Sequence, residues 1–334
     1  MLRHDPLASV CSVVAAFAAV MGCSGSGDDS KGSGGAGSAT GGSSSAGGSA
    51  TQAVGTFTVK LVPQSATGTP AQTQLVGAVR EAATPVLIVW RTNLTAGDCT
   101  VVTPVAPFCD PGCNGATQSC VEGGICVASE PKAHSVGDVT VAGVKTVAGG
   151  PLTMSPTAAL TYAASVANLQ YPPFAEGDAV QLTAAGGDYS AFTLDAKGIP
   201  PLVMGTSSTV LSPGQPISLI WDAPTSGENA RVLISIDISQ HGGTRAKILC
   251  NTADTGALEI SGELVTRLIS LGVSGFPIIQ VTRRAVGSAK IAPGRVDLQL
   301  DSMVELEVSV AGYQSCHTDA DCPTGTCQAD LVCR

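Results

Sequence analysis

Apolar and polar side chains alternate along most of the chain after Thr56. Alternation with a period of two predicts strands that bury one face and expose the other. Three segments show it most clearly, with apolar residues at Phe57, Val59 and Leu61, at Val232, Ile234, Ile236 and Ile238, and at Val304, Leu306, Val308 and Val310. Further strands are expected at 85–91, 137–147, 179–184, 191–195, 216–221, 245–250, 276–284 and 295–301.

Glycine-containing turn sequences separate these segments, at 186–188, 212–214 and 254–256. Turn signals at such intervals are typical of a sandwich or a barrel. The sequence therefore predicts an all-β fold: an antiparallel, immunoglobulin-like β-sandwich with one short helix and two small disulfide-rich modules.

The short helix is expected over 261–271, where the period changes. Leu264, Val265, Leu268 and Ile269 fall on one face of a helix, Ser261 precedes it as a capping residue, and Gly272 follows as a stop. A helix with one apolar face lies against a core, so we expect it to pack on the sheet.

The chain begins with a segment of a different kind. Residues 7–21 are almost wholly apolar or small, and they lead into Val20-Met21-Gly22-Cys23. The run is too short to span a membrane comfortably and is typical of a secretory signal. Its end resembles the bacterial lipobox, which implies a signal peptide at 1–22 and a lipid on Cys23. The alternative is a conventionally cleaved signal in which Cys23 is an ordinary thiol.

A glycine- and serine-rich tether follows. Residues 24–50 hold 10 glycines and 9 serines, a composition that cannot bury a core. The expected organisation is a signal at 1–22, lipidated Cys23 and linker at 23–53, and an N-terminal β region at 54–149 with a cysteine-rich insert at 99–126. A C-terminal β-sandwich at 150–313 and a disulfide module at 314–334 complete it. Whether the β regions form one domain or two stays open.

Charge is sparse and acidic. The chain carries 17 basic and 26 acidic residues, a net charge of −9, and charged residues make up 13% of it. An acidic balance makes nucleic acid an unfavourable partner.

Ten cysteines remain after Cys11 and Cys23, an even number that predicts disulfides in an exported chain. The last four resemble small knotted modules of the form C-x2-D-x-D-C-P-x-G-x-x-C. Of their three pairings we favour the interlaced Cys316–Cys327 and Cys322–Cys333. Of the 15 pairings open to the other six we favour Cys99–Cys250, Cys109–Cys120 and Cys113–Cys126. Because the terminal cysteines can pair internally, we expect their module to fold independently.

No metal or cofactor is expected. The chain lacks a C-x-x-C pair, and an exported compartment oxidises thiols. Asp319 and Asp321 are expected to accept backbone N–H bonds within a tight turn, with calcium near His317 as the alternative.

Candidate chemistry is limited to one polar cluster. The sequence contains no G-x-S-x-G, H-E-x-x-H or P-loop pattern. His241 stands beside a glycine turn after the strand that carries Asp237, and Asp254 follows the next strand. We interpret His241 as a solvated turn residue, with a catalytic site as the alternative. Trp90 and Trp221 end apolar strands and are expected in cores, with sugar stacking as the alternative.

The whole layout resembles uncharacterised predicted lipoproteins of Gram-negative bacteria, a resemblance that implies the outer membrane or cell surface and no activity.

The sequence leaves two classes of function open. The preferred hypothesis is a non-catalytic surface protein, held to the membrane by its lipid, that binds a protein or glycan ligand in adhesion or scaffolding. The alternative is a hydrolase that uses His241 with a nearby carboxylate, which clustering of Asp237, His241 and Asp254 in one cleft would favour.

Overall fold

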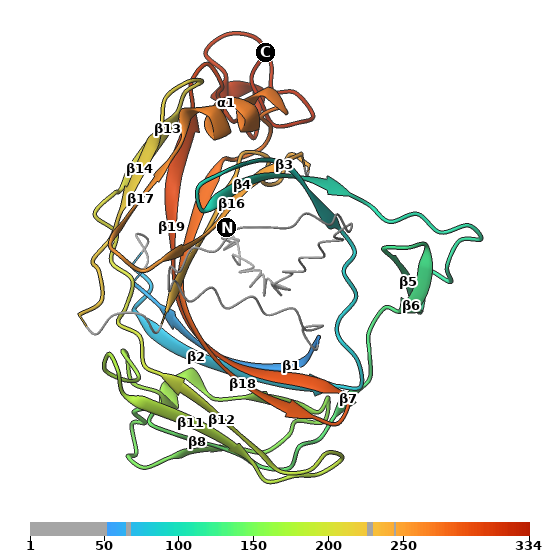
Figure 1. The fold of residues 1–334 in the computed structure, drawn as a ribbon. Coiled ribbons are helices and arrows are strands. Elements are labelled where there is room, and N and C mark those ends of the chain that lie inside the picture. Colours follow the sequence, from blue (N-terminus) through green and yellow to red (C-terminus); the bar gives the residue numbers. More distant parts are fainter. Residues whose placement is uncertain (1–51, 65–67, 226–229, 244) are drawn as a thin grey trace, which may run out of the picture. The chain divides into compact units, whose positions relative to one another are not determined.

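The structure is a computed structural model that describes residues 52–64, 68–225, 230–243 and 245–334 (Figure 1). Cys23 and the signal, and almost all of the tether, lie outside the described residues. The described part is mostly strand with one α-helix, which confirms the predicted all-β class. Its strands are β1 (Ala53–Val62), β2 (Gln72–Arg80), β3 (Val89–Ala96), β4 (Cys99–Val105), β5 (Gln118–Val121), β6 (Ile125–Ala128), β7 (Ala133–His134), β8 (Val139–Ala142), β9 (Leu152–Met154), β10 (Thr161–Ala163), β11 (Ala179–Ala184), β12 (Phe192–Lys197), β13 (Ser208–Leu211), β14 (Ile217–Ile220), β15 (Arg231–Asp237), β16 (Lys247–Ala253), β17 (Ala257–Ile260), β18 (Ile278–Ile291) and β19 (Gly294–Val310).

The largest sheet runs in the order β10-β2-β1-β19-β18-β15-β16-β4-β3, with β13 beside β19 and β7 beside β2. Most neighbours are antiparallel, as predicted. Two pairings are parallel, β1 with β19 and β13 with β19, and the first sets Thr56 opposite Asp297. The first strand of the chain therefore lies inside the sheet, between a neighbour in sequence and the last strand of all.

A second sheet, of order β12-β11-β8-β9, packs on one end of the large sheet (Figure 1). The two layers enclose the first core, which includes Phe57, Val59, Leu182 and Leu298. The layers approach closely because β18 carries Gly287 where it meets β12. A Cβ atom at Gly287 would lie 1.9 Å from the carbonyl oxygen of Asp195.

The second core lies between the large sheet and a layer of β14, β17 and helix α1 (Gly262–Ser270). Val232, Ile234 and Ile236 of β15 point into it, as their alternation predicts. The hydroxyl of Ser261 accepts a bond from the backbone N–H of Leu264 at 3.4 Å and caps the helix. The apolar face predicted for this helix, Leu264, Val265, Leu268 and Ile269, is buried.

Two disulfide modules complete the described part. The β5–β6 hairpin belongs to the insert and lies beyond the ends of β3 and β4 (Figure 1). The terminal module follows β19. The structure pairs the ten cysteines as Cys99–Cys250, Cys109–Cys120, Cys113–Cys126, Cys316–Cys327 and Cys322–Cys333, the five pairs that we favour from the sequence.

The structure draws no boundary between residues 149 and 150. Strands β1 to β4 come from the expected N-terminal region, and β15 to β19 from the expected C-terminal region, yet β1, β2, β3 and β4 share a sheet with β15, β16, β18 and β19. Alternation reports which face of a strand is buried but not which strand lies beside it, so the pattern could not show that the two regions share one sheet. The two cores meet instead along β18 and β19.

Candidate functional site

Asp237 ends β15 and is held by two neighbours. Its Oδ2 lies 3.0 Å from Nζ of Lys247, the residue opposite it on β16. Its Oδ1 accepts bonds from the backbone N–H of Ser239 at 2.8 Å and from the Ser239 hydroxyl at 3.0 Å. The carboxylate thus fixes the turn that follows the strand and neutralises a lysine.

His241 is exposed in that turn. Its backbone has φ of +65°, the left-handed region that few side chains adopt, and Gly242 beside it packs on the backbone of Gly275. The imidazole meets the ring of Phe276 edge-on, with centroids 6.5 Å apart. The structure therefore places His241 as the sequence analysis interprets it, as a turn residue facing solvent.

Asp254 lies in the interior, where its side chain is 2% exposed. Its Oδ2 accepts from Nε of Arg283 at 2.6 Å, and its Oδ1 accepts from Nε1 of Trp221 at 2.7 Å and from an Arg283 terminal nitrogen at 3.1 Å. Trp221 is buried in the second core, as predicted, and its indole N–H donates the hydrogen bond to the Asp254 carboxylate. Asp254 therefore belongs to a buried ion pair and not to the surroundings of His241.

Arg283 sits where the two cores meet. On β18 it lies between Val281, which faces the second core, and Ala285, which faces the first. Besides Asp254, its guanidinium donates to the carbonyls of Pro200 and Pro201, both at 3.2 Å, and of Asp222 at 2.6 Å. The arginine thereby fastens the segment after β12 and the end of β14 to the large sheet.

The three residues singled out by the sequence are thus dispersed. Asp237 is bound to Lys247 and Ser239, Asp254 to Arg283 and Trp221, and His241 contacts an aromatic ring. A general base needs its partner within hydrogen-bond reach, and each carboxylate is oriented toward another residue. The arrangement is one of structural supports rather than a catalytic triad.

Sequence reasoning did not single out His134, whose imidazole forms ion-pair contacts with two acids. Its Nδ1 lies 3.1 Å from Oδ2 of Asp188, and its Nε2 lies 4.0 Å from Glu81. The backbone N–H of Ser135 donates to the same Asp188 oxygen, and this bond, with His134, holds the pKa of Asp188 below its usual range. Burial, and then Glu81 and Asp188, raise the pKa of Tyr189, whose ring lies beside His134.

This His134 cluster joins β7 to the loop before β12. The backbone bond from Asp188 to the Ser135 carbonyl, 2.8 Å long, runs in parallel with the side-chain contacts. The hydroxyl of Ser135 accepts from Gly137 N–H and so stays within its own turn. No sequence signal could have linked His134 to Asp188, because the two are 54 residues apart and meet only in the fold.

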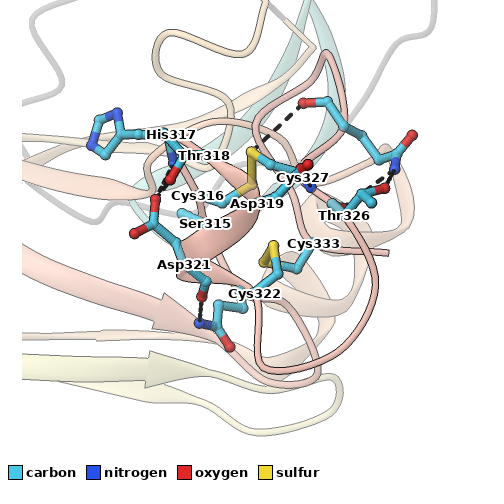
Figure 2. Close-up of a disulfide and its surroundings, with 12 residues drawn as sticks. Ser315, Cys316, His317, Thr318, Asp319, Asp321, Cys322, Thr326, Cys327 and Cys333 are labelled. Atoms are coloured by element: carbon cyan, nitrogen blue, oxygen red, sulfur yellow. Dashed lines mark hydrogen bonds between the residues drawn. A yellow bond between two sulfur atoms is a disulfide. The ribbon is translucent and has the colours of Figure 1, made fainter.

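Figure 2 shows the terminal module, where both aspartates bind backbone. Asp321 accepts from the N–H groups of His317 and Thr318 at 2.7 and 2.9 Å, and Asp319 accepts from Cys327 N–H at 2.8 Å. The prediction for these aspartates is therefore confirmed. Two groups of three sulfur atoms lie close together in the modules, but all of them belong to disulfides and offer no thiolate to a metal.

The terminal module contacts the loop before β18, and its independent folding stays a prediction. The backbone carbonyl of Asp330 accepts a bond from Gly275 N–H at 2.7 Å, and its carboxylate lies 3.7 Å from the Arg245 guanidinium. The hydroxyl of Ser315 donates to the Gly275 carbonyl. The rings of His317 and Phe276 stack with centroids 4.3 Å apart. The backbone N–H and carbonyl of Gly275, in the loop before β18, form these hydrogen bonds. Backbone contacts of this kind cannot be predicted from the pattern of apolar side chains.

Two open depressions lie on the surface of the described part. One depression of about 500 Å³ lies between α1 and β3 and is lined by Asn93, Leu94, Glu263, Thr266, Arg267 and Ser270. A second, of about 420 Å³, follows the terminal module from Gly312 to Arg334. Neither is lined by Asp237, His241 or Asp254, and neither encloses a reactive group in the way that an active-site cleft does.

Of the large apolar side chains in the described part, Phe108 of the insert is the most exposed. Phe108 is 82% exposed and Ile125 is 59% exposed, and both flank disulfides of the insert. Exposed Val105, Leu87 and Ile88 lie on the side of the large sheet from which the insert leaves.

No protein-family model matches the chain, and no curated protein matches it. Among solved structures, a crystal structure of chicken CNTN1 FN1-FN3 domains aligns with 69% of this chain and 71% of its own, at 8% identity and a TM-score of 0.18. Neither the fold described above nor the function proposed below depends on that similarity. None of the helices in the described part combines the length and the apolar character needed to cross a membrane.

Proposed function

We propose that this protein is an exported lipoprotein, held to the outer membrane or cell surface through Cys23, that binds a partner without catalysis. The observation that supports this most is the separate use of Asp237, His241 and Asp254, each engaged in its own structural contacts. The five disulfides suit an oxidising, extracytoplasmic compartment. The ligand class, a protein or a glycan, belongs to the proposal.

The anchor is tested by fractionation. Cys23→Ser should move the protein from the membrane fraction to the soluble exported fraction and abolish its labelling by a palmitate analogue, because the residue that carries the multiple acyl chains of the anchor is lost. Cys11→Ser is the matched control, since Cys11 lies within the cleaved segment and should change neither. Unaltered membrane partition of Cys23→Ser would overturn the anchor.

The absence of catalysis is tested with a panel of ester and glycoside substrates. The native protein and His241→Ala should be equally inactive, because Asp237 and Asp254 are both engaged by residues other than His241. Hydrolysis that disappears in His241→Ala and persists in His317→Ala, a control at another exposed histidine, would establish the hydrolase in place of the binding protein.

A further inference from the structure

The depression of about 420 Å³ on the terminal module is built from two chain segments that meet there. One is the turn after β19, at 312–314, and the other is the loop at 323–325, with Cys333 and Arg334 beside them. Cys333 joins the two segments, because its N–H donates to the Gln314 carbonyl at 2.9 Å and its sulfur is bonded to Cys322 (Figure 2). A site that is ordered in this way loses little entropy when a ligand binds.

Tyr313 supplies an aromatic surface to this depression. Its side chain is 42% exposed, and its backbone N–H donates to the Val310 carbonyl at 3.0 Å, which fixes the turn that carries it. A tyrosine ring has an apolar face and a hydroxyl group that both donates and accepts hydrogen bonds. A ligand that contacts Tyr313 should therefore combine an apolar face with a polar edge.

The charge of Arg334, at the side of the depression, is compensated. Its guanidinium donates to the two carboxylate oxygens of Asp330, at 3.1 and 2.7 Å. The hydrogen bond and the charge of Asp330 raise the pKa of Arg334, and Tyr313 adds to that rise, so the phenol lies near the guanidinium. The guanidinium thus offers its remaining N–H donors to a ligand without offering a net charge.

Hydrogen-bonding groups of both kinds line the rest of the depression. Gln314 donates its side-chain N–H to the Asp321 carbonyl at 2.6 Å, a bond that leaves the amide oxygen as an acceptor. The hydroxyl of Thr324 has no hydrogen-bond partner among the described residues and can both donate and accept. Donors, acceptors and an aromatic ring therefore converge on one small volume.

We propose that this depression binds one sugar unit of a neutral glycan, with the apolar face of the sugar ring against Tyr313 and the sugar hydroxyls on Gln314, Thr324 and Arg334. A pyranose ring carries C–H groups on its face and hydroxyls at its edge, and each hydroxyl both donates and accepts, as the lining groups require. An ionic ligand meets no uncompensated charge in the described lining. The proposal rests on the proposed function, of which it names the ligand class and the site.

The probes are three neutral trisaccharides, triacetylchitotriose, cellotriose and maltotriose, with trigalacturonate as a carboxylated comparison. Calorimetric titration uses the exported chain with Cys23→Ser. At least one neutral trisaccharide should bind, and trigalacturonate should bind more weakly than that sugar. In saturation-transfer NMR, irradiation of the aromatic resonances should transfer saturation to ring C–H protons of the bound sugar.

Tyr313→Ala should lower the affinity for the bound trisaccharide by roughly tenfold or more and abolish the saturation transfer, because the stacking surface is lost. Tyr313→Phe keeps the ring and should retain most of the affinity. Phe108→Ala is the matched control, since Phe108 is an aromatic side chain that is 82% exposed outside the depression, and it should bind as the parent does. Thermal melting verifies that each variant is folded.

Three results would overturn the proposal: no binding of any neutral trisaccharide, tighter binding of trigalacturonate, or an affinity unchanged in Tyr313→Ala. Binding of a polyproline peptide that is lost in Tyr313→Ala, with no sugar bound, would assign the depression to a polypeptide ligand instead. Failure here is distinguishable from failure of the proposed function, because the Cys23→Ser fractionation and the substrate panel do not depend on Tyr313.

Discussion

Arg283 is the largest fully buried side chain in the described part of the chain. Burial of a charge is costly unless its partner and its hydrogen bonds are complete. Here the guanidinium meets the Asp254 carboxylate and three carbonyls, so the position where the two cores join is polar but satisfied. Ser302, opposite Arg283 on β19, accepts from Leu202 N–H at 2.8 Å and extends the same junction.

Arg283→Met should lower the free energy of unfolding by about 3–5 kcal/mol, because it leaves Asp254 charged and buried without its cation. Urea unfolding measures the change. Arg283→Met combined with Asp254→Asn should cost less than the sum of the single variants, since no uncompensated charge remains.

Arg231→Met on β15 is the control. Arg231 is exposed and bonds Asn251 on the neighbouring strand, so its loss should cost within about 1 kcal/mol. Equal losses for Arg231→Met and Arg283→Met would mean that the buried pair contributes nothing beyond an exposed contact.

Asp188 makes the stability of the His134 cluster depend on pH. Because its pKa in the folded chain lies below the ordinary value of 3.8, its contribution is present above that pH and is lost as pH falls through the folded pKa. Asp188→Asn should therefore be less stable than the native chain at neutral pH, and the gap should close in acid. Unfolding curves from neutral to acidic pH measure the gap, with Asp110→Asn as a control for the loss of one negative charge.

Elements that bury one face could be predicted from the sequence. The alternation in β15, the helix from its serine cap to its glycine stop, and the disulfide framework are all local in origin. The pattern does not predict β2, because Thr73 and Gly77 take the place of large apolar residues on its inward face, and Gly77 is required there by the Phe57 ring, which a Cβ atom would meet at 2.1 Å. The parallel neighbour of β1 and the partners of Asp254 could not be predicted, because each depends on residues distant in sequence.

The Cys99–Cys250 disulfide links β4 and β16 at residues that lie opposite each other. It closes a loop with a sequence separation of 151 residues, which restricts the unfolded chain strongly. Replacing both cysteines with alanine should lower the free energy of unfolding by about 2–5 kcal/mol. Denaturant titration of the double variant tests this, and a loss well below 1 kcal/mol would show that the unfolded chain is already restrained by other means.

At the scale of the whole molecule, the terminal module acts as a cap on the loop before β18. Truncation after Gly312 removes the contacts of Asp330, Ser315 and His317 with Gly275 and Phe276. If these are worth about 1–2 kcal/mol, the melting temperature should fall by about 3–6 °C. Scanning calorimetry measures the melting temperature of the truncated chain. An unchanged value would show that the terminal module folds independently, as the sequence predicts.

The position of β1 has a consequence for how the chain reaches this structure. Of the described strands β1 is made first and its parallel neighbour β19 is made last, so Thr56 must wait for Asp297. Pairing of such distant segments is slow, and until it occurs the edge of the β1–β2 hairpin is open to wrong partners. The large sheet therefore cannot be completed stepwise during synthesis; it closes only after β19 has been made.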